Sequence, residues 1–412
     1  MEKYDNMREF KELILMLENN WNMQVHSLTI FRHVLDDDVF CKFLLLCDSM
    51  QEDLSTKVDR YCTFVSSLYQ NDTDFSAYLY RWLMNDENTV IHRISRKESL
   101  PQALQDSLHA ELEILEEISS ITSDQMIEWM HYDGFLPKWE TSHFDFEKDY
   151  FAHLHALPKE GYGVFAKYRA FGIQHGRLVP IIHPDPQRLS DLIGYKRERE
   201  QVIKNSLAFL EGIKVNNVLL YGDAGTGKSS TVKAIVNEYY KEGLRLIEVK
   251  KDQLAVLPEI MDSLADNPLH FIIFIDDLSF KSNDDDFVAL KNILEGGIQN
   301  NQNNCVVYAT SNRRHFVQEN SKNRDGGELF RNDSIQETMS LAARFGLTVT
   351  FTKPLKDLYL EIVMQLADRY QIETDRDVLA IQAEAYAIRN SGRSPRTAKQ
   401  FIEYTKINEK IK

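Results

Sequence analysis

The stretch from Gly222 to Ser229 limits the possible folds of this chain more than any other part of its sequence. It reads Gly-Asp-Ala-Gly-Thr-Gly-Lys-Ser, follows the apolar run Val218 to Tyr221, and precedes a helix-like run from Ser230 to Glu242. Glycine tolerates positive φ and has no Cβ, so the three glycines let the backbone turn with its N–H groups facing inward. This spacing, between a strand and a helix, is typical of a phosphate-binding loop.

The polar positions of the loop fit the same chemistry. The helix that follows directs its positive end toward bound phosphates. The side chain of Lys228 can reach the β- and γ-phosphates, and the Ser229 hydroxyl can coordinate Mg²⁺. We therefore expect a bound nucleotide to contact the whole loop: Gly222, Asp223, Ala224, Gly225, Thr226, Gly227, Lys228, Ser229 and Ser230.

An acidic pair follows the most strand-like apolar run of the chain. The run Phe271 to Ile275 is followed directly by Asp276 and Asp277. In α/β sheets, ligands bind beyond the carboxyl ends of the strands. We expect Asp276 to hold Mg²⁺ through water and Asp277 to orient or deprotonate an attacking water. The alternative is a solvated turn, but the order of the pair after a phosphate-binding loop favours the metal site.

Short apolar strands separated by helices predict an α/β fold. The five strands are expected at Val218 to Tyr221, Leu246 to Val249, Phe271 to Ile275, Val306 to Ala309 and Leu347 to Phe351. Continuous apolar strands indicate a parallel sheet that is covered by helices on both faces. We predict a five-stranded parallel sheet within residues 189–352, followed by a helical lid at residues 353–412.

Residues 1–150 differ from the rest of the chain in charge. They contain 29 Asp and Glu against 13 Lys and Arg, which leaves 34 acidic and 35 basic side chains for residues 151–412. Apolar residues at helical spacing predict an all-helical N-terminal domain over residues 1–150. Its negative charge disfavours nucleic-acid binding by this part and is typical of a solubilising surface.

The sequence also indicates the cellular compartment. Its start is polar and unlike a signal peptide, and no apolar run is long enough to span a membrane. The four cysteines, Cys41, Cys47, Cys62 and Cys305, show no C-x-x-C spacing, so we expect free thiols. These features predict a cytoplasmic protein.

Residues 151–188 are expected to join the two parts. Glycines and prolines interrupt regular structure here. Aromatic residues alternate with basic ones, among them Phe165, Lys167 and Phe171. Such rings could stack on nucleic-acid bases, or they could form a linker that packs on its neighbour. A single short segment favours the packed linker.

Further polar residues follow the later strands. Asn312 comes directly after the fourth strand and could position a water molecule near the γ-phosphate, with Thr310 as a second choice. Arg344 precedes the fifth strand, and Arg393 and Arg396 lie near the start of the last helix. Either region could reach phosphates, but spacing alone does not distinguish these arginines from ordinary surface cations.

From about Leu189 onward the chain resembles an AAA+ ATPase. Ile193 and Gly194 lie in a segment similar to the one that this family carries near the adenine. The loop from Gly222 to Ser229 resembles Walker A, and Phe271 to Asp277 resembles Walker B. With the preceding junction included, the sequence is similar to a bacterial AAA+ family whose members are described only as ATP-binding proteins.

This resemblance implies roles for the remaining residues. Asn312 matches sensor 1, and Arg344 is similar to the arginine finger of replication initiators and helicase loaders. Arg396 fits sensor 2, with Arg393 as the alternative. Asp277 stands where many members carry Glu, and its shorter side chain predicts slow turnover, although initiators of similar sequence also carry an Asp pair.

The resemblance implies that the chain binds ATP and Mg²⁺ and hydrolyses ATP. Arg344 would act in trans, in a homo-oligomeric ring or spiral. Three roles are compatible with these features: an ATPase that remodels or loads a protein or nucleic-acid partner, a nucleotide-dependent switch, and a scaffold that recruits a protein client through residues 1–150. The charge distribution does not support nucleic-acid binding.

Overall fold

The computed structural model describes residues 23–278, 280–281, 285–294, 304–312, 317–318, 343–390 and 392–411. Its contacts divide the chain into two compact units, Met1–Leu157 and Pro158–Lys412. Residues 1–22 of the predicted helical domain lie outside the described part of the chain. Among the described helices, none is both long and apolar enough to cross a bilayer.

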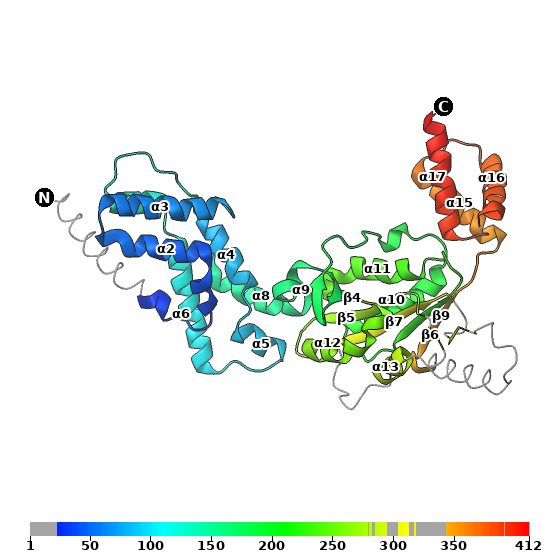
Figure 1. Cartoon of the computed structure of the whole chain (residues 1–412), viewed down its shortest axis with the longest axis horizontal. Helices are drawn as coiled ribbons and strands as arrows, with labels where there is room; N and C mark the ends of the chain where they lie inside the picture. The colour runs from blue at the N-terminus through cyan, green and yellow to red at the C-terminus, as the bar shows by residue number, and fades with distance from the viewer. Residues whose placement is uncertain are drawn as a thin grey trace. The chain divides into compact units, whose positions relative to one another are not determined.

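Helices joined by loops make up the described part of the first unit (Figure 1). The helices are η1 (Arg32–Asp36), α2 (Asp38–Asp48), η2 (Ser49–Gln51), α3 (Leu54–Tyr69), α4 (Phe75–Asn85), α5 (Thr89–Ser95), α6 (Gln102–Ser119), α7 (Ser123–Met130) and α8 (Phe146–Glu160). Aromatic rings fill its core: the Phe43 and Phe75 centroids lie 4.7 Å apart, and those of Phe64 and Trp139 lie 5.1 Å apart. The prediction of a helical N-terminal region is confirmed for the described residues.

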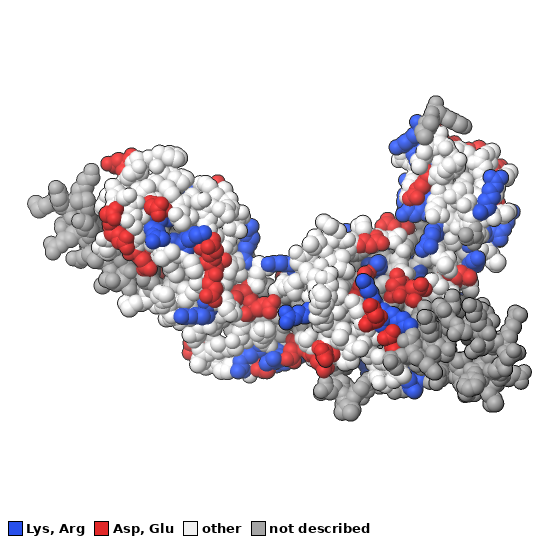
Figure 2. All heavy atoms as spheres, viewed as in Figure 1, with Lys and Arg blue, Asp and Glu red and all other residues white. Residues whose placement is uncertain are grey.

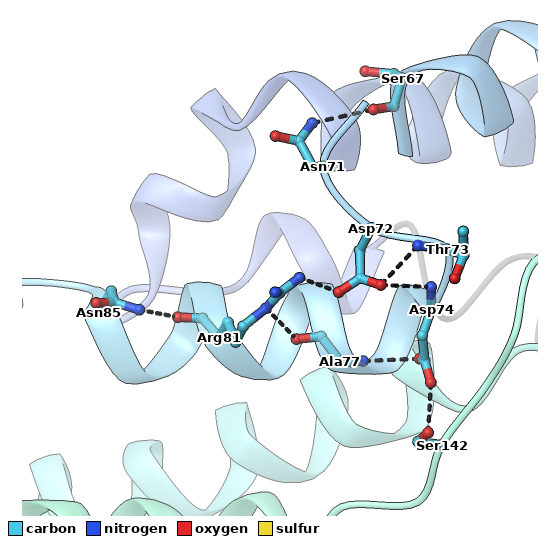
Figure 3. Close-up of polar contacts among 9 residues, drawn as sticks. All are labelled: Ser67, Asn71, Asp72, Thr73, Asp74, Ala77, Arg81, Asn85 and Ser142. Atoms are coloured by element: carbon cyan, nitrogen blue, oxygen red, sulfur yellow. Dashed lines mark hydrogen bonds and ion pairs between the residues drawn. The ribbon is translucent and has the colours of Figure 1, made fainter. Parts of the chain in front are cut away.

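Carboxylates fix the start of α4 (Figure 3). Asp74 caps this helix, because its side chain accepts a hydrogen bond from the Ala77 amide at 2.9 Å. The other carboxylate oxygen of Asp74 accepts a hydrogen bond from the Ser142 hydroxyl at 2.5 Å. Asp72 forms an ion pair with Arg81 one to two turns into the helix. The negative charges here have local structural roles and do not form a separate ligand site.

Most of the acidic surface of the first unit is solvated. Figure 2 shows red patches of carboxylates on the visible face of this unit, with smaller blue patches among them. Several carboxylates pair with lysines at the surface, as in Lys42–Asp38 and Lys138–Asp124, both at 2.6 Å. Exposed pairs of this kind contribute little to stability. They neutralise only part of the negative charge of residues 1–150, which hold 29 acidic and 13 basic side chains.

A seven-stranded sheet forms the centre of the second unit, with the order β2-β1-β4-β5-β7-β3-β9. Its strands are β1 (Ala170–Gln174), β2 (Arg177–Pro180), β3 (Val218–Gly222), β4 (Leu244–Val249), β5 (His270–Ile275), β7 (Cys305–Ser311) and β9 (Leu347–Phe351). All neighbours are parallel except β1 and β2. The predicted α/β fold with a parallel sheet is confirmed, but the predicted number of five strands is wrong. A separate parallel pair joins β6 (Phe280–Lys281) to β8 (Val317–Gln318).

Helices cover both faces of this sheet (Figure 1). Alternate strand residues contribute to two separate cores, one on each face. The helices of the second unit are α9 (Gly163–Lys167), η3 (Leu189–Asp191), α10 (Lys196–Leu210), α11 (Lys228–Tyr239), η4 (Tyr240–Glu242), η5 (Lys251–Val256), α12 (Leu257–Leu264), α13 (Asp285–Leu294), α15 (Lys356–Tyr370), α16 (Arg376–Arg389) and α17 (Pro395–Ile411). On β5, Ile272 packs with α10 and α11, whereas Ile273 packs with α12 and α13. This two-sided burial explains why the central strand β5 is apolar from Phe271 to Ile275.

The two additional strands come from the segment that the sequence analysis assigns to a junction. Glycines and aromatic residues interrupt its apolar pattern, so the β1–β2 hairpin has no clear strand signature. The Phe165 ring packs at a tilt against Phe171 and edge-on against Phe271, with centroid distances of 4.9 and 5.4 Å. Phe171 and Phe271 are fully buried. These rings are core residues, which agrees with the packed alternative and not with stacking on bases.

Arg245 attaches this segment to the sheet. Its guanidinium is buried and donates hydrogen bonds to the carbonyl oxygens of Glu160, Phe165, Tyr240 and Leu244, at 2.7 to 3.0 Å. Burial lowers its pKa to about 10, so the side chain stays charged at neutral pH. A single cation thus satisfies carbonyl groups at the end of α8, in α9 and beside β4.

The three helices of the lid form a small bundle of their own. Tyr359, Val363, Leu379, Ala383 and Ile402 are buried in its core. The last helix begins at Pro395, a residue suited to the first turn of a helix.

Replacing Arg245 by Met should destabilise the second unit selectively. The change leaves buried carbonyl groups without donors, and each such group costs about 1–3 kcal/mol. All four tryptophans, Trp21, Trp82, Trp129 and Trp139, precede the second unit. Urea unfolding followed by far-UV circular dichroism should therefore shift to lower urea, while the tryptophan fluorescence transition stays in place. The exposed Arg177→Met is the matched control, and equal behaviour of the two variants would contradict this role of Arg245.

Candidate functional site

The phosphate-binding loop begins where β3 ends, between β7 and β9. Gly222 has a φ of +130°, and a Cβ at this position would lie 2.1 Å from the carbonyl oxygen of Phe351 on β9. The next amide, that of Asp223, donates to the same oxygen at 2.9 Å. Gly227, with a φ of +93°, immediately precedes α11. Gly222 is therefore required for two reasons, its positive φ and the close approach of β3 and β9. Gly227 is favoured by its positive φ alone.

Lys228 lies in the first turn of α11 and is only 5% exposed. Its Nζ donates to the carbonyl oxygens of Gly222 and Asp223, at 3.1 and 2.7 Å, and to Oδ1 of Asn312 at 2.8 Å. Burial lowers the pKa of this ammonium, and the negative charges of Asp223, Asp277 and Asp276 oppose that effect. The structure thus holds a cation at the centre of the loop, where it can interact with phosphate oxygens.

Asp276 follows β5 and meets two hydroxyl groups. Its Oδ1 accepts hydrogen bonds from Ser229 Oγ and Thr310 Oγ1, both at 2.6 Å. Octahedral Mg²⁺ binds oxygen at about 2.0–2.1 Å, so adjacent ligands lie about 2.9 Å apart. The oxygens of Ser229 and Asp276 are close enough to serve as neighbouring ligands. The described residues contain no cluster of three or more His, Cys, Asp or Glu placed to hold a metal, and Mg²⁺ usually needs few protein ligands because it retains water.

Asp277 has an unusual backbone conformation, with a φ of +52°. Its amide donates to Thr310 Oγ1 at 2.9 Å, and its Oδ1 accepts from Asn312 Nδ2 at 2.7 Å. The amide of Asn312 therefore links the Lys228 ammonium to the Asp277 carboxylate. Both of its polar atoms are used, which orients the carboxylate at the edge of the cavity.

A cavity of about 530 Å³ lies between the loop, the acidic pair and the lid. This volume is within the range of small-molecule sites. Ala224, Gly225, Thr226, Ser229 and Ser230 contribute to its wall near the loop. Of the residues predicted to lie near the base, Ile193 lines the cavity, whereas Gly194 is not among the lining residues. A Cβ on Gly194 would approach Ile362 of α15 to 3.0 Å.

The predicted arginines occupy three different environments. Arg396 lines the cavity, and its backbone amide donates to the Gly225 carbonyl at 3.2 Å. Arg393 instead forms a two-bond ion pair with Glu384, at 2.9 and 2.6 Å. Arg344 is not among the residues lining the cavity. It precedes β9, whose first residue pairs with Val218 at the start of β3, whereas the phosphate-binding loop follows the opposite end of that strand.

Several cavity residues are absent from the sequence-based site. They are Gln187, Asp191, Leu192, Arg199, Ile362, Leu366, Pro395 and Lys399. Ile362 and Leu366 follow helical spacing on α15, and this pattern predicts core residues of the lid, not ligand contacts. Arg199 lies in a run of charged residues on α10, and such a run predicts a solvated helix surface. Thr310, only a second choice in the sequence analysis, contacts both members of the acidic pair.

Removing the Thr310 hydroxyl should loosen the backbone of the acidic pair. Thr310→Val keeps the shape of the side chain but removes the nearer of the two acceptors of the Asp277 amide, leaving Asp276 Oδ1 at 3.1 Å. A hydrogen bond of this kind contributes about 1 kcal/mol, so exchange of the Asp277 amide with deuterium should accelerate about fivefold. Thr310→Ser retains the hydroxyl and should exchange at nearly the original rate. An unchanged rate in Thr310→Val would show that the hydroxyl does not hold this backbone.

Comparison with known proteins gives matches over the second unit. A stretch of 126 residues is 25% identical to the replication factor C large subunit of Methanococcus vannielii, covering 30% of this chain and 25% of that protein. The structure aligns with Thermotoga maritima RuvB, a Holliday junction branch migration motor, at 17% identity and a TM-score of 0.36, over 53% of this chain and 63% of RuvB. It aligns with AMPPCP-bound DnaA of Aquifex aeolicus at 16% identity and a TM-score of 0.39, over 55% of this chain and 67% of DnaA. The chain thus spans about a quarter of its curated relative and less than two thirds of RuvB.

A match to a protein family extends much further along the chain. Residues 165–409, from α9 to the last helix, match the family described as "Protein of unknown function (DUF815)". These residues include the seven strands, the phosphate-binding loop, the acidic pair and most of the lid. Because the match covers more than half of the sequence, the chain belongs to the DUF815 family.

Proposed function

We propose that this protein is an ATPase that hydrolyses ATP with Mg²⁺ at a site completed by a neighbouring subunit. One observation carries the proposal: hydrogen bonds join Lys228, Ser229, Asp276, Asp277 and Asn312 at one end of the cavity. They bring a cation, a hydroxyl, two carboxylates and an amide to the end of the cavity where phosphates would bind. These are the groups that phosphoryl transfer to water requires.

The loop and its lysine would bind the triphosphate. Backbone N–H groups of residues 224–229 form the phosphate cradle, and Lys228 exchanges its carbonyl partners for phosphate oxygens. The side chains of Ser229 and Asp276 would hold Mg²⁺, Asp276 directly or through water. When bound, the ion would neutralise charge on the phosphate oxygens.

The second carboxylate would act on the attacking water. Asp277 is exposed at the cavity wall, and the hydrogen bond from Asn312 orients it. In the proposed step, the water oxygen attacks the γ-phosphorus, its proton passes to Oδ of Asp277, and the bond to the β–γ bridging oxygen breaks. ADP and phosphate are the products.

Two arginines would stabilise the developing charge from different chains. Arg396 lines the cavity of its own chain and is the better candidate for the lid arginine, because Arg393 is paired with Glu384. Arg344 precedes the amino end of β9, away from the loop of its own chain, and would act on the site of a neighbour. The acidic first unit would recruit a protein client, so that hydrolysis remodels or loads that partner.

Lys228→Ala should abolish nucleotide binding. Loss of the central cation removes the charge-assisted contacts to the phosphates, so the affinity for ATP should fall at least 100-fold. Isothermal titration with ATP and Mg²⁺ measures this directly. Lys233→Ala, on the same helix but paired with Glu248, is the matched control and should bind like the wild type. If Lys228→Ala binds ATP normally, the assigned site is wrong.

A mixing experiment tests whether Arg344 acts in trans. Arg344→Ala should bind ATP but lose turnover by about 10³-fold or more. Lys228→Ala should be inactive alone, yet its intact Arg344 can complete the site of an Arg344→Ala subunit. Equimolar mixing should therefore restore part of the ATPase rate. Arg389→Ala, an exposed lid variant, should retain full activity alone, and failure of the mixture to recover any turnover would contradict action in trans.

A further inference from the structure

Arg199 borders the cavity but does not belong to the phosphate-binding machinery. It lies near the start of α10 and is 8% exposed. Its Nη2 donates to the carbonyl oxygen of Leu192 at 2.9 Å. Leu192 belongs to the strap, defined here as residues Gln187–Ile193. Four of its residues, Gln187, Asp191, Leu192 and Ile193, line the cavity.

The guanidinium of Arg199 has more donors than the strap uses. Arginine carries five N–H donors and no acceptor. The bond to Leu192 uses one of them, and none of the Arg199 nitrogens is among the buried polar atoms without a partner in the described residues. Because the side chain is nearly buried and lines the cavity, that space is where its remaining donors could meet an acceptor of a ligand.

The electrostatic surroundings make an acceptor favourable at this position. Burial lowers the pKa of Arg199, and the neighbouring Glu198 offsets this only in part. Asp191 lines the same cavity, but its nearest cation is Arg369, with Nη1 at 3.5 Å from Oδ1. A buried cation gains most from a ligand atom that accepts a hydrogen bond.

The neighbours of Arg199 identify which part of a nucleotide would face it. Ile193, Ile362 and Leu366 provide apolar wall beside the strap, whereas Lys228 and Ser229 lie at the phosphate end. An apolar slot with one cationic donor suits a flat heteroaromatic ring that has acceptor nitrogens. Adenine presents such acceptors at N1, N3 and N7.

We propose that Arg199 is a base-contacting residue, which donates from its guanidinium to a ring nitrogen of the adenine. The inference rests on the proposed ATP site and adds a residue outside its sequence motifs. Arg199 would hold the strap with one donor and the base with others. Loss of its side chain should therefore weaken contacts to the base but leave those to the phosphates.

The test compares a ligand that has a base with one that lacks it. ATP and inorganic tripolyphosphate are titrated, each with Mg²⁺, into the full-length wild type, Arg199→Met and Arg197→Met. Met keeps much of the apolar stem but has no donor, and Arg197 is exposed on the same helix. For Arg199→Met we expect about 10- to 100-fold weaker ATP binding, the range for a hydrogen bond to a charged group, with tripolyphosphate binding unchanged. Arg197→Met should bind both ligands like the wild type.

Other outcomes overturn the proposal. Equal weakening of ATP and tripolyphosphate would make Arg199 a phosphate contact or a purely structural residue. Unchanged ATP binding would exclude the contact. If Arg199→Met does not fold, Arg199→Gln, which keeps an N–H donor for the strap, replaces it under the same criteria. Failure of the wild type to bind ATP would instead count against the proposed function, and this result is obtained before any variant is compared.

Discussion

The close approach of β3 and β9 at Gly222 is the constraint on which the rest of the site depends. A side chain there would collide with the Phe351 carbonyl, so the strand must end in glycine and the chain must turn into the loop. The parallel register aligns the neighbouring strand ends as well: Tyr221 is opposite Ser311, and Ile275 is opposite Ala309. Residues that follow three separate strands therefore reach one edge of the sheet.

Asn312 shows why that edge needs a particular chemical group. Its Oδ1 accepts from the Lys228 ammonium while its Nδ2 donates to the Asp277 carboxylate. A carboxylate at this position could only accept, and an ammonium could only donate. An amide satisfies both neighbours and keeps the opposite charges of Lys228 and Asp277 in a fixed arrangement. Thr310 has the same double use, because its hydroxyl donates to Asp276 and accepts from the Asp277 amide.

The sequence predicts well those parts of the molecule whose signals are local. Each of these signals lies within a few consecutive residues. They are the glycine spacing of the loop, the apolar run before Asp276, and the strand patterns of β3 and β9. The β1–β2 hairpin has no such signal. Phe165 is recognised as a core residue only from its contacts with Phe171 and Phe271, which are distant or unmarked in the sequence. Its attachment through Arg245 is equally non-local, since the acceptors are carbonyl groups, which every residue carries.

The same limit applies within the cavity. Ile362 and Leu366 are ordinary apolar positions of a helix until the lid lies beside the strap. Arg199 is one of several charged residues on α10, and only its burial and its bond to Leu192 distinguish it. The roles proposed for Arg344 and for the acidic first unit involve other molecules, so they are not encoded in the local pattern of one sequence.

The attachment of the strap to the lid has a kinetic consequence. Arg369 of α15 donates to the carbonyl oxygens of Ser190 and Asp191, at 2.5 and 3.1 Å, while Asn237 of α11 holds the carbonyl oxygen of Gln187 at 2.8 Å. One end of the strap is thus fixed to the core and the other to the helical bundle. Under the proposed function, a tilt of that bundle would move the strap, so the release rate of ADP would depend on the position of the lid.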